Sequence, residues 1–205
     1  MSHLPGLSPE IVHLVIAAPY GVKDCEYEKS IFAPYIPPYQ RALQLVQLYY
    51  EKAAWMYDIV SDLCHTLPNH YLSDDIRYRP ILRPEFDSAI LNMLYDQGGR
   101  PCVEMLHPHR ISTFFIALAL GAHYELESAV GETDPETYNL LALAALSLAS
   151  IIHEVTCSAL QALFLTIQYH YFTDVGTDET RWLLFGALCR AAQIVGFPHL
   201  VAPLI

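Results

Sequence analysis

The sequence predicts an all-α protein built from antiparallel helical pairs that pack as a helical array or solenoid. Apolar residues make up 53% of the 205 positions and charged residues only 16%, which is enough for a sizeable buried core. Apolar positions recur at steps of three and four residues, and typical helix-capping residues stand at their boundaries. No segment alternates apolar and polar residues at two-residue steps, so no strand is predicted.

Residues 1–37 are predicted to be a loop-rich lead-in, because prolines interrupt any regular helix there. Pro38 is suited to the first position of the first predicted helix, 38–57, in which Trp55 lies on or beside the apolar stripe. A short helix at about 58–65 and a break over 66–83 are expected to follow.

The next predicted helix spans 85–96 and ends at the Gly98-Gly99 pair. The motif His107-Pro108-His109-Arg110 introduces a helix over about 109–127. Its interior is apolar almost all round, which is typical of a helix buried at the centre of a protein.

Three further helices have recognisable start signals, with a side-chain cap before the first turn. The expected caps and helices are Asp134 for about 134–152, Thr156 or Ser158 for 157–172, and Thr177 for 177–195. Gly196 stands where a left-handed terminator is expected, and Pro198 prevents the last helix from continuing.

Composition excludes several classes of protein. The net charge is −11, from 11 basic and 22 acidic residues, so direct nucleic-acid binding is disfavoured. The five cysteines are widely spaced and odd in number, which indicates a reducing intracellular compartment and no disulfide framework. No basic, apolar leader of the signal-peptide type opens the sequence.

Residues 155–172 have no formal charge, which raises the possibility of a membrane span. Gln161, Gln168, Tyr169 and His170 interrupt its apolar character, and no basic loop sets a topology. Buried core helices are therefore the favoured interpretation, and a small membrane protein is the less favoured alternative.

Two histidine patterns raise the question of a metal site. His153-Glu154-Val155-Thr156-Cys157 approaches the zinc-protease pattern HExxH, with Cys157 in place of the second histidine. His107 and His109 form an HxH pair. No third ligand is evident for either, so capping and packing roles are expected, and no metal or cofactor is predicted in this chain.

The other unusual clusters also have structural interpretations. Arg77, Arg79 and Arg83 are expected to neutralise acidic neighbours such as Glu85, although an anionic partner is the alternative. A second cluster is aromatic and could line a ligand cavity, although core packing is the favoured interpretation. Its members are Tyr169, Tyr171, Phe172 and Trp182.

Nucleophile elbows, phosphate loops and dinucleotide fingerprints are absent from the sequence, so no enzyme is predicted and no catalytic residue is assigned.

Three segments together resemble the middle homology region, the regulatory domain of fungal zinc-cluster transcription factors. They read LVQLYYEKAAWMYD at 45–58, LHPHRISTFFIALALGAHYELE at 106–127 and SALQALFLTIQYHYFTDVGTDETRWLLFGALCRAAQIVGF at 158–197. The motif positions we single out, mostly as structural residues, are Trp55, His107, His109, Arg110, Gln161, Tyr169, Trp182, Gly186 and Gln193.

The resemblance implies an all-α regulatory domain, over 38–205, of a nuclear transcription regulator. Its expected partners are other domains of the factor, co-regulators or a small effector. In that family a separate cluster of six cysteines holds two zinc ions and binds DNA; no such cluster is present here, so no zinc-binding or DNA-contacting role transfers to any residue of this chain.

The sequence also stops before the arginine-rich helix that the family pattern places after this point, so a C-terminally truncated, partial domain that self-associates is expected. The alternative function is an all-α protein or enzyme that binds a hydrophobic ligand in an aromatic cavity.

Overall fold

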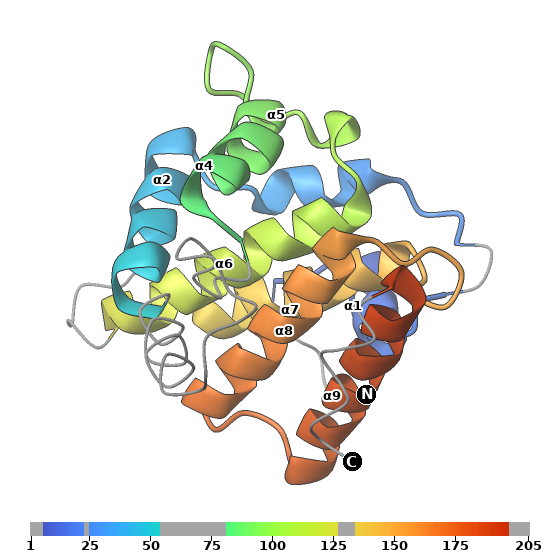
Figure 1. Cartoon of the computed structure of the whole chain (residues 1–205). Coiled ribbons are helices and arrows are strands. Elements are labelled where there is room, and N and C mark those ends of the chain that lie inside the picture. The colour runs from blue at the N-terminus through green and yellow to red at the C-terminus, as the bar shows by residue number, and fades with distance from the viewer. Residues whose placement is uncertain (1–5, 23–24, 54–80, 127–133, 197–205) are drawn as a thin grey trace.

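The computed structural model describes residues 6–22, 25–53, 81–126 and 134–196, and these residues form an all-α protein (Figure 1). Helix α6 (Pro108–Leu126) crosses the middle of the molecule, and α2 (Tyr39–Leu48), α7 (Pro135–Leu148) and α8 (Cys157–Phe172) pack against it. The predicted fold class is therefore confirmed for this part of the chain. In a solenoid each helical pair contacts only the neighbouring pairs along the array. Here α2, α7 and α8 all pack around one central helix, α6.

The sequence of α6 explains its central position. Every residue from 111 to 120 is fully buried, including Ser112 and Thr113. Both hydroxyls donate hydrogen bonds to backbone carbonyls: Ser112 to Ala142 of α7, and Thr113 to His109 and to Ser158 of α8. The helix can be buried all round because its polar side chains are satisfied by its neighbours.

Helices α2 and α6 cross at Gly121. A Cβ atom built at this glycine would lie 2.0 Å from the carbonyl oxygen of Leu45, so only glycine allows the two backbones to approach this closely. Near the same crossing, Arg41 of α2 donates two hydrogen bonds to Glu125 of α6, at 2.6 and 2.5 Å. The resulting pair fixes the end of α6 against the start of α2.

The prediction of a loop-rich lead-in over 1–37 is wrong for much of its described part. Helix α1 (Pro9–Ile16) begins at a Ser8 cap with Pro9 in its first turn, and it packs on α7. The 3-10 helix η1 (Lys29–Tyr35) accommodates Pro34. Burial of Ile11 and Phe32 in the main core explains why these segments are ordered helices.

The helix predicted at 85–96 is present but differs at both ends. It runs without a break through α4 (Arg83–Phe86), the π-helical segment η3 (Asp87–Leu91) and α5 (Asn92–Leu94). The Gly98-Gly99 pair does not end this helix, because the backbone is already extended at Tyr95. Instead the glycines lie in a turn closed by a single antiparallel bridge between Tyr95 and Pro101.

The first predicted helix is confirmed over α2, which continues as the π-helical segment η2 (Tyr49–Ala53). Pro38 is the residue before the helix rather than its first member. The remainder of that helix, including Trp55, lies outside the described residues. The same holds for the helix expected at 58–65 and for most of the break over 66–83.

The C-terminal helices confirm the predicted caps. Asp134, Thr156 and Thr177 each accept a hydrogen bond from a backbone N–H in the first turn of α7, α8 and α9 (Asp178–Val195) respectively. Gly196 ends α9 in the left-handed conformation, with φ of 92°. Helix α7 ends at Leu148, earlier than the predicted 152, and a connector over 149–156 leads to α8.

Helices α8 and α9 form an antiparallel pair that has its own small core (Figure 1). Ala159 and Ala162 of α8 are buried in this second cluster with Leu184 and Ala187 of α9. Small residues on both helices allow their axes to approach closely. No helix within the described residues is long and apolar enough to cross a membrane.

Candidate functional site

The motif His107-Pro108-His109-Arg110 joins three parts of the fold at the start of α6. His109 is fully buried, and its Nε2 lies 2.8 Å from the carbonyl oxygen of Ala149, at the end of α7. Because a carbonyl only accepts, Nε2 carries the proton and donates. The Thr156 hydroxyl then donates to Nδ1 at 2.8 Å and accepts from the N–H of Ala159 as the α8 cap.

Both ring nitrogens of His109 are therefore used to connect α6, α7 and α8. Burial lowers the pKa of His109 below its ordinary value, which agrees with a neutral ring that donates once and accepts once. No ring nitrogen is left for a metal ion. The capping and packing role expected for this histidine is the one its geometry supports.

His107 and Arg110 of the same motif extend this junction. His107 accepts the backbone N–H of His109 at its Nδ1, and its Nε2 lies 3.1 Å from Glu154 Oε1 in the connector between α7 and α8. Arg110 donates to the carbonyl oxygen of Ala89 at 3.4 Å. Across the described ranges, no group of three or more histidine, cysteine, aspartate or glutamate side chains is placed to hold a metal ion.

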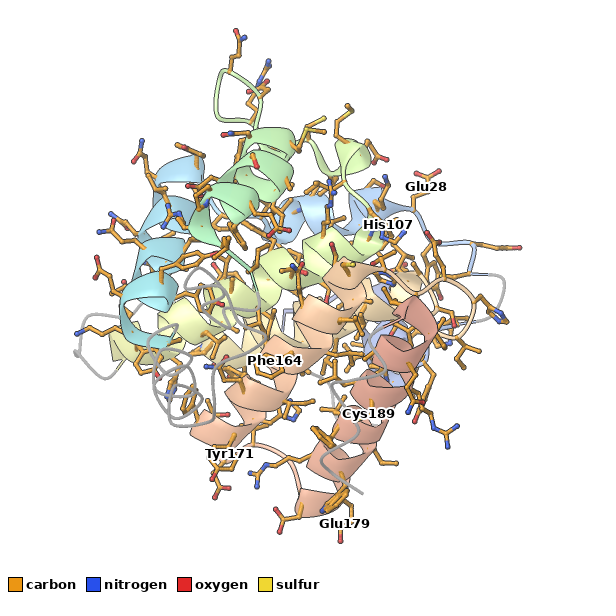
Figure 2. All side chains as sticks on the ribbon, in the orientation of Figure 1. Glu28, His107, Phe164, Tyr171, Glu179 and Cys189 are labelled. Carbon is orange, nitrogen blue, oxygen red and sulfur yellow. The ribbon has the colours of Figure 1, made fainter. Side chains whose placement is uncertain are left out.

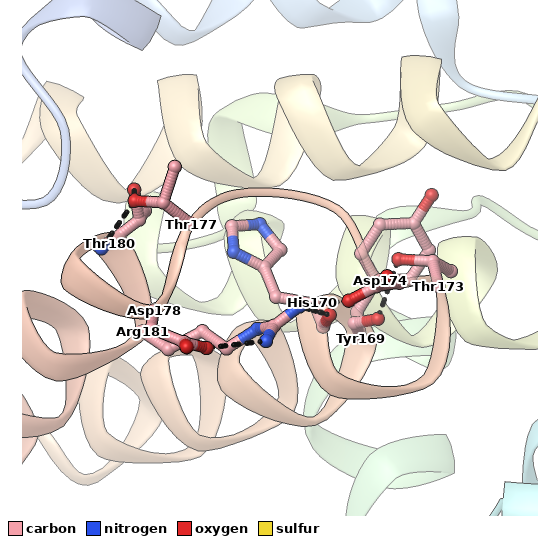
Figure 3. A network of polar contacts seen from close by, with 8 residues as sticks. All are labelled: Tyr169, His170, Thr173, Asp174, Thr177, Asp178, Thr180 and Arg181. Atoms are coloured by element: carbon pink, nitrogen blue, oxygen red, sulfur yellow. Dashed lines mark hydrogen bonds and ion pairs between the residues drawn. The ribbon is translucent and has the colours of Figure 1, made fainter.

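A second polar network holds the corner between α8 and α9 (Figure 3). The Arg181 guanidinium donates to Asp174 at 2.8 Å, to Asp178 at 3.0 Å and to the backbone carbonyl of His170 at 3.2 Å. Thr177 caps α9 in the same corner by accepting the N–H of Thr180. One arginine therefore ties the last turn of α8 to the first turn of α9, with the two aspartates at the surface.

A buried pair of polar side chains lies beneath this corner. Asn139 Nδ2 and His170 Nε2 are 3.4 Å apart, while Asn139 Oδ1 and His170 Nδ1 have no hydrogen-bond partner among the described residues. Burial, and after it the nearby Arg181 charge, lowers the pKa of His170. The neutral imidazole is therefore the stable form at this position.

The family-motif residues of α8 have structural positions. Tyr169 is 2% exposed and belongs to the main core, and burial raises the pKa of its hydroxyl. Its backbone carbonyl accepts from the N–H and the hydroxyl of Thr173, which ends the helix. Gln161 is half-buried on α8.

The motif residues of α9 lie on the opposite side of their helix from the core. Trp182 is 75% exposed, and Gly186 and Gln193 are also exposed. Leu183, Phe185 and Ile194 add exposed apolar surface to the same helix. The α9 outer face is defined here as Trp182, Leu183, Phe185, Gly186, Cys189, Gln193 and Ile194. Figure 2 locates it by Glu179 at the beginning of α9 and by Cys189 further along.

The aromatic cluster proposed for a ligand cavity does not converge. Tyr169 is buried, and Phe172 packs edge-on against Tyr124, with ring centres 6.0 Å apart. Tyr171 and Trp182 are about three-quarters exposed, and Figure 2 shows Tyr171 directed away from the protein. These four side chains therefore do not line one cavity.

The arginine cluster is seen only in part, since Arg77 and Arg79 lie outside the described residues. Arg83 pairs with Asp87 at 2.8 Å, not with Glu85, and its guanidinium lies 5.3 Å from the centre of the Tyr50 ring. The spacing of four residues along one helix explains the choice of Asp87.

Two charged contacts between helices are not predicted from the sequence: Arg41–Glu125 between α2 and α6, and Arg181 with its aspartates between α8 and α9. Arg41 and Glu125 are 84 positions apart, and no local pattern links them. Arg181, by contrast, lies three residues after Asp178 and seven after Asp174, a spacing that could have been recognised at the predicted start of α9. Comparisons with protein-family models, curated proteins and solved structures found no match.

Proposed function

We propose that this chain is a regulatory domain of a fungal-type zinc-cluster transcription factor, which acts in the nucleus and takes part in the regulation of transcription without binding DNA itself. It acts through contacts with other domains of the factor or with co-regulators. Binding of such a partner, or of a small effector, would shift the balance between helix packings and so change the activity of attached domains.

One observation supports the proposal: the family-motif residues fall into a buried group and an exposed group. His109 and Tyr169 are buried where helices meet, and the fold itself explains them. Trp182, Gly186 and Gln193 are exposed together on the α9 outer face, where the described fold makes no use of a tryptophan. Exposed apolar residues gathered on one helix face are typical of an interaction surface.

Charge supports the division between this domain and a DNA-binding one. The chain has 22 acidic and 11 basic residues, so its net charge disfavours binding to a phosphate backbone. Arg181, at the corner between α8 and α9, is already paired with Asp174 and Asp178. Contacts with protein partners are therefore favoured over contacts with nucleic acid.

The test joins the full chain to an unrelated DNA-binding domain and measures a reporter gene in fungal cells. Trp182→Ala is compared with Tyr171→Ala, a matched change because the two aromatic side chains are equally exposed, at 75% and 74%. We expect the tryptophan change to alter reporter output and the tyrosine change to leave it near wild type, at equal protein levels.

A second arm measures binding of the purified chain to double-stranded DNA by fluorescence anisotropy at physiological salt. No binding is expected up to high micromolar protein. Specific DNA binding by the chain alone, or a reporter that ignores both substitutions, would contradict the proposed function.

A further inference from the structure

The α9 outer face has features that point to a particular occupant. Four of its positions, Trp182, Gly186, Cys189 and Gln193, fall within about 60° of one another around the helix, at 3.6 residues per turn. Phe185 borders this stripe on one side and Leu183 on the other. The stripe therefore has the spacing of a seam between two helices.

Gly186 is the least expected member of this stripe. Glycine in the middle of a helix is unfavourable, and here a Cβ atom would meet no other atom within 4 Å. At Gly121 the same residue type is explained by the backbone of α2, which passes 2.0 Å from the Cβ position. Nothing within the described chain uses the space beside Gly186, which fits a second backbone that approaches from outside.

The charged residues beside the stripe indicate whether a second helix would run parallel or antiparallel to α9. Glu179 and Arg190 lie on the same side of the stripe, near opposite ends of α9, and eleven residues of helix separate them by about 16 Å. They are too far apart to pair along one helix. Two antiparallel copies of α9 would place Glu179 of each copy beside Arg190 of the other.

We propose that the α9 outer face is the contact surface of a symmetric dimer, in which a second copy of this chain supplies an antiparallel α9. In this register Leu183 of one copy lies opposite Gly186 of the other, so a side chain meets the space that the glycine leaves. A two-fold axis makes both ion pairs and both Leu183–Gly186 contacts form at once. The second copy would then occupy the same surface on which the proposed function rests.

The size of the surface sets the expected affinity. Helix α9 has 18 residues, about 27 Å of length, and Trp182 at 75% exposure offers on the order of 150 Å². One helix pair lies at the lower end of specific interfaces, below about 1,200 Å² in total. We expect a dissociation constant on the order of 10 µM, so the dimer forms at high protein concentration and dissociates on dilution.

The test is sedimentation equilibrium of the full chain between about 1 and 200 µM, a range that brackets the expected constant. Trp182→Glu should weaken the dimer at least about tenfold by placing a charge in the seam. Tyr171→Glu, an equally exposed aromatic outside the stripe, should leave it unchanged. Circular dichroism shows whether each variant keeps its helices.

Charge exchange tests the direction of the pair. Glu179→Lys and Arg190→Glu should each weaken the dimer several-fold, and the double variant should restore it, because each new lysine then faces a new glutamate in the other copy. Eleven residues along one helix cannot give this rescue within a single chain.

A chain that stays monomeric at 200 µM, an association that survives Trp182→Glu, or a double variant without rescue would each overturn the proposed dimer. A monomer whose reporter output still depends on Trp182 would leave the regulatory proposal standing and show that another protein or segment covers α9. The two proposals therefore fail separately.

Discussion

Two glycines in the middle of helices allow one substitution to be tested with opposite expected results. In Gly121→Ala the new Cβ would lie 2.0 Å from the carbonyl oxygen of Leu45, whereas real contacts below 3.0 Å are essentially never seen. The two backbones would have to separate by at least 1 Å, the difference between these two distances. Ala42, Leu45 and Val46 of α2 are fully buried, so this movement disturbs close packing.

The expected magnitude follows from two opposing effects. Overpacking against a backbone atom that cannot rotate away costs about 3 kcal/mol, the upper end of the usual range. The better helix propensity of alanine returns about 1 kcal/mol. The net loss of about 2 kcal/mol should lower the melting temperature by about 4–8 °C in a chain of this length.

Gly186→Ala is the matched control. The added Cβ meets no atom within 4 Å, so only the gain of about 1 kcal/mol in propensity remains. Its melting temperature should rise by about 2–4 °C, measured at low protein concentration where the chain is monomeric. Thermal unfolding followed by circular dichroism checks both variants. If Gly121→Ala melted at or above the wild-type temperature, the close crossing of α2 and α6 would be refuted.

Three further changes test the polar contacts. Arg41→Ala should cost about 1.5–3 kcal/mol in urea unfolding because it leaves Glu125 without its two-pronged partner, and Arg41→Lys should recover only part of that loss. Thr156→Ala should cost about 1–2 kcal/mol by removing the α8 cap and the donor to His109, whereas Thr156→Ser should stay within about 0.5 kcal/mol; equal losses for both would argue against the cap. Burial lowers the pKa of His109 and of His170 below 6.5, so the unfolded chain binds more protons and stability should fall below that pH, by at most about 1.4 kcal/mol per pH unit for each histidine. Urea unfolding at pH 7.5, 6.5 and 5.5 should show a smaller slope in His109→Gln, and an unchanged slope would contradict the buried neutral ring.

Local signals predicted the C-terminal half of the fold well. Thr156 and Thr177 stand directly before apolar helices, and a hydroxyl cap depends only on residues within one turn. The same reasoning applies to Gly196, whose left-handed backbone ends α9. The all-round apolar sequence of α6 likewise predicts its central burial.

The errors occurred where long-range packing decides the outcome. Ser8-Pro9-Glu10 is the same kind of helix start as Asp134-Pro135-Glu136, but the many prolines around it favour a loop. Burial of Ile11 against distant helices outweighed that composition. The partners of His109 also lie 40 and 47 positions away, so the sequence indicated a packing histidine but not which helices it joins.

The N-terminal segment has a practical consequence for anyone who shortens this chain. Ile11 and Leu14 of α1 are inaccessible to solvent, and Gly21 leaves no room for a side chain against the backbone of Ser147 and Ser150 at the end of α7. A fragment starting at residue 38, the boundary that the proline pattern suggests, would lack α1 and would expose the surface of α7 on which α1 packs. Such a fragment should bind hydrophobic dyes and precipitate, while the uncut chain stays clear under the same conditions.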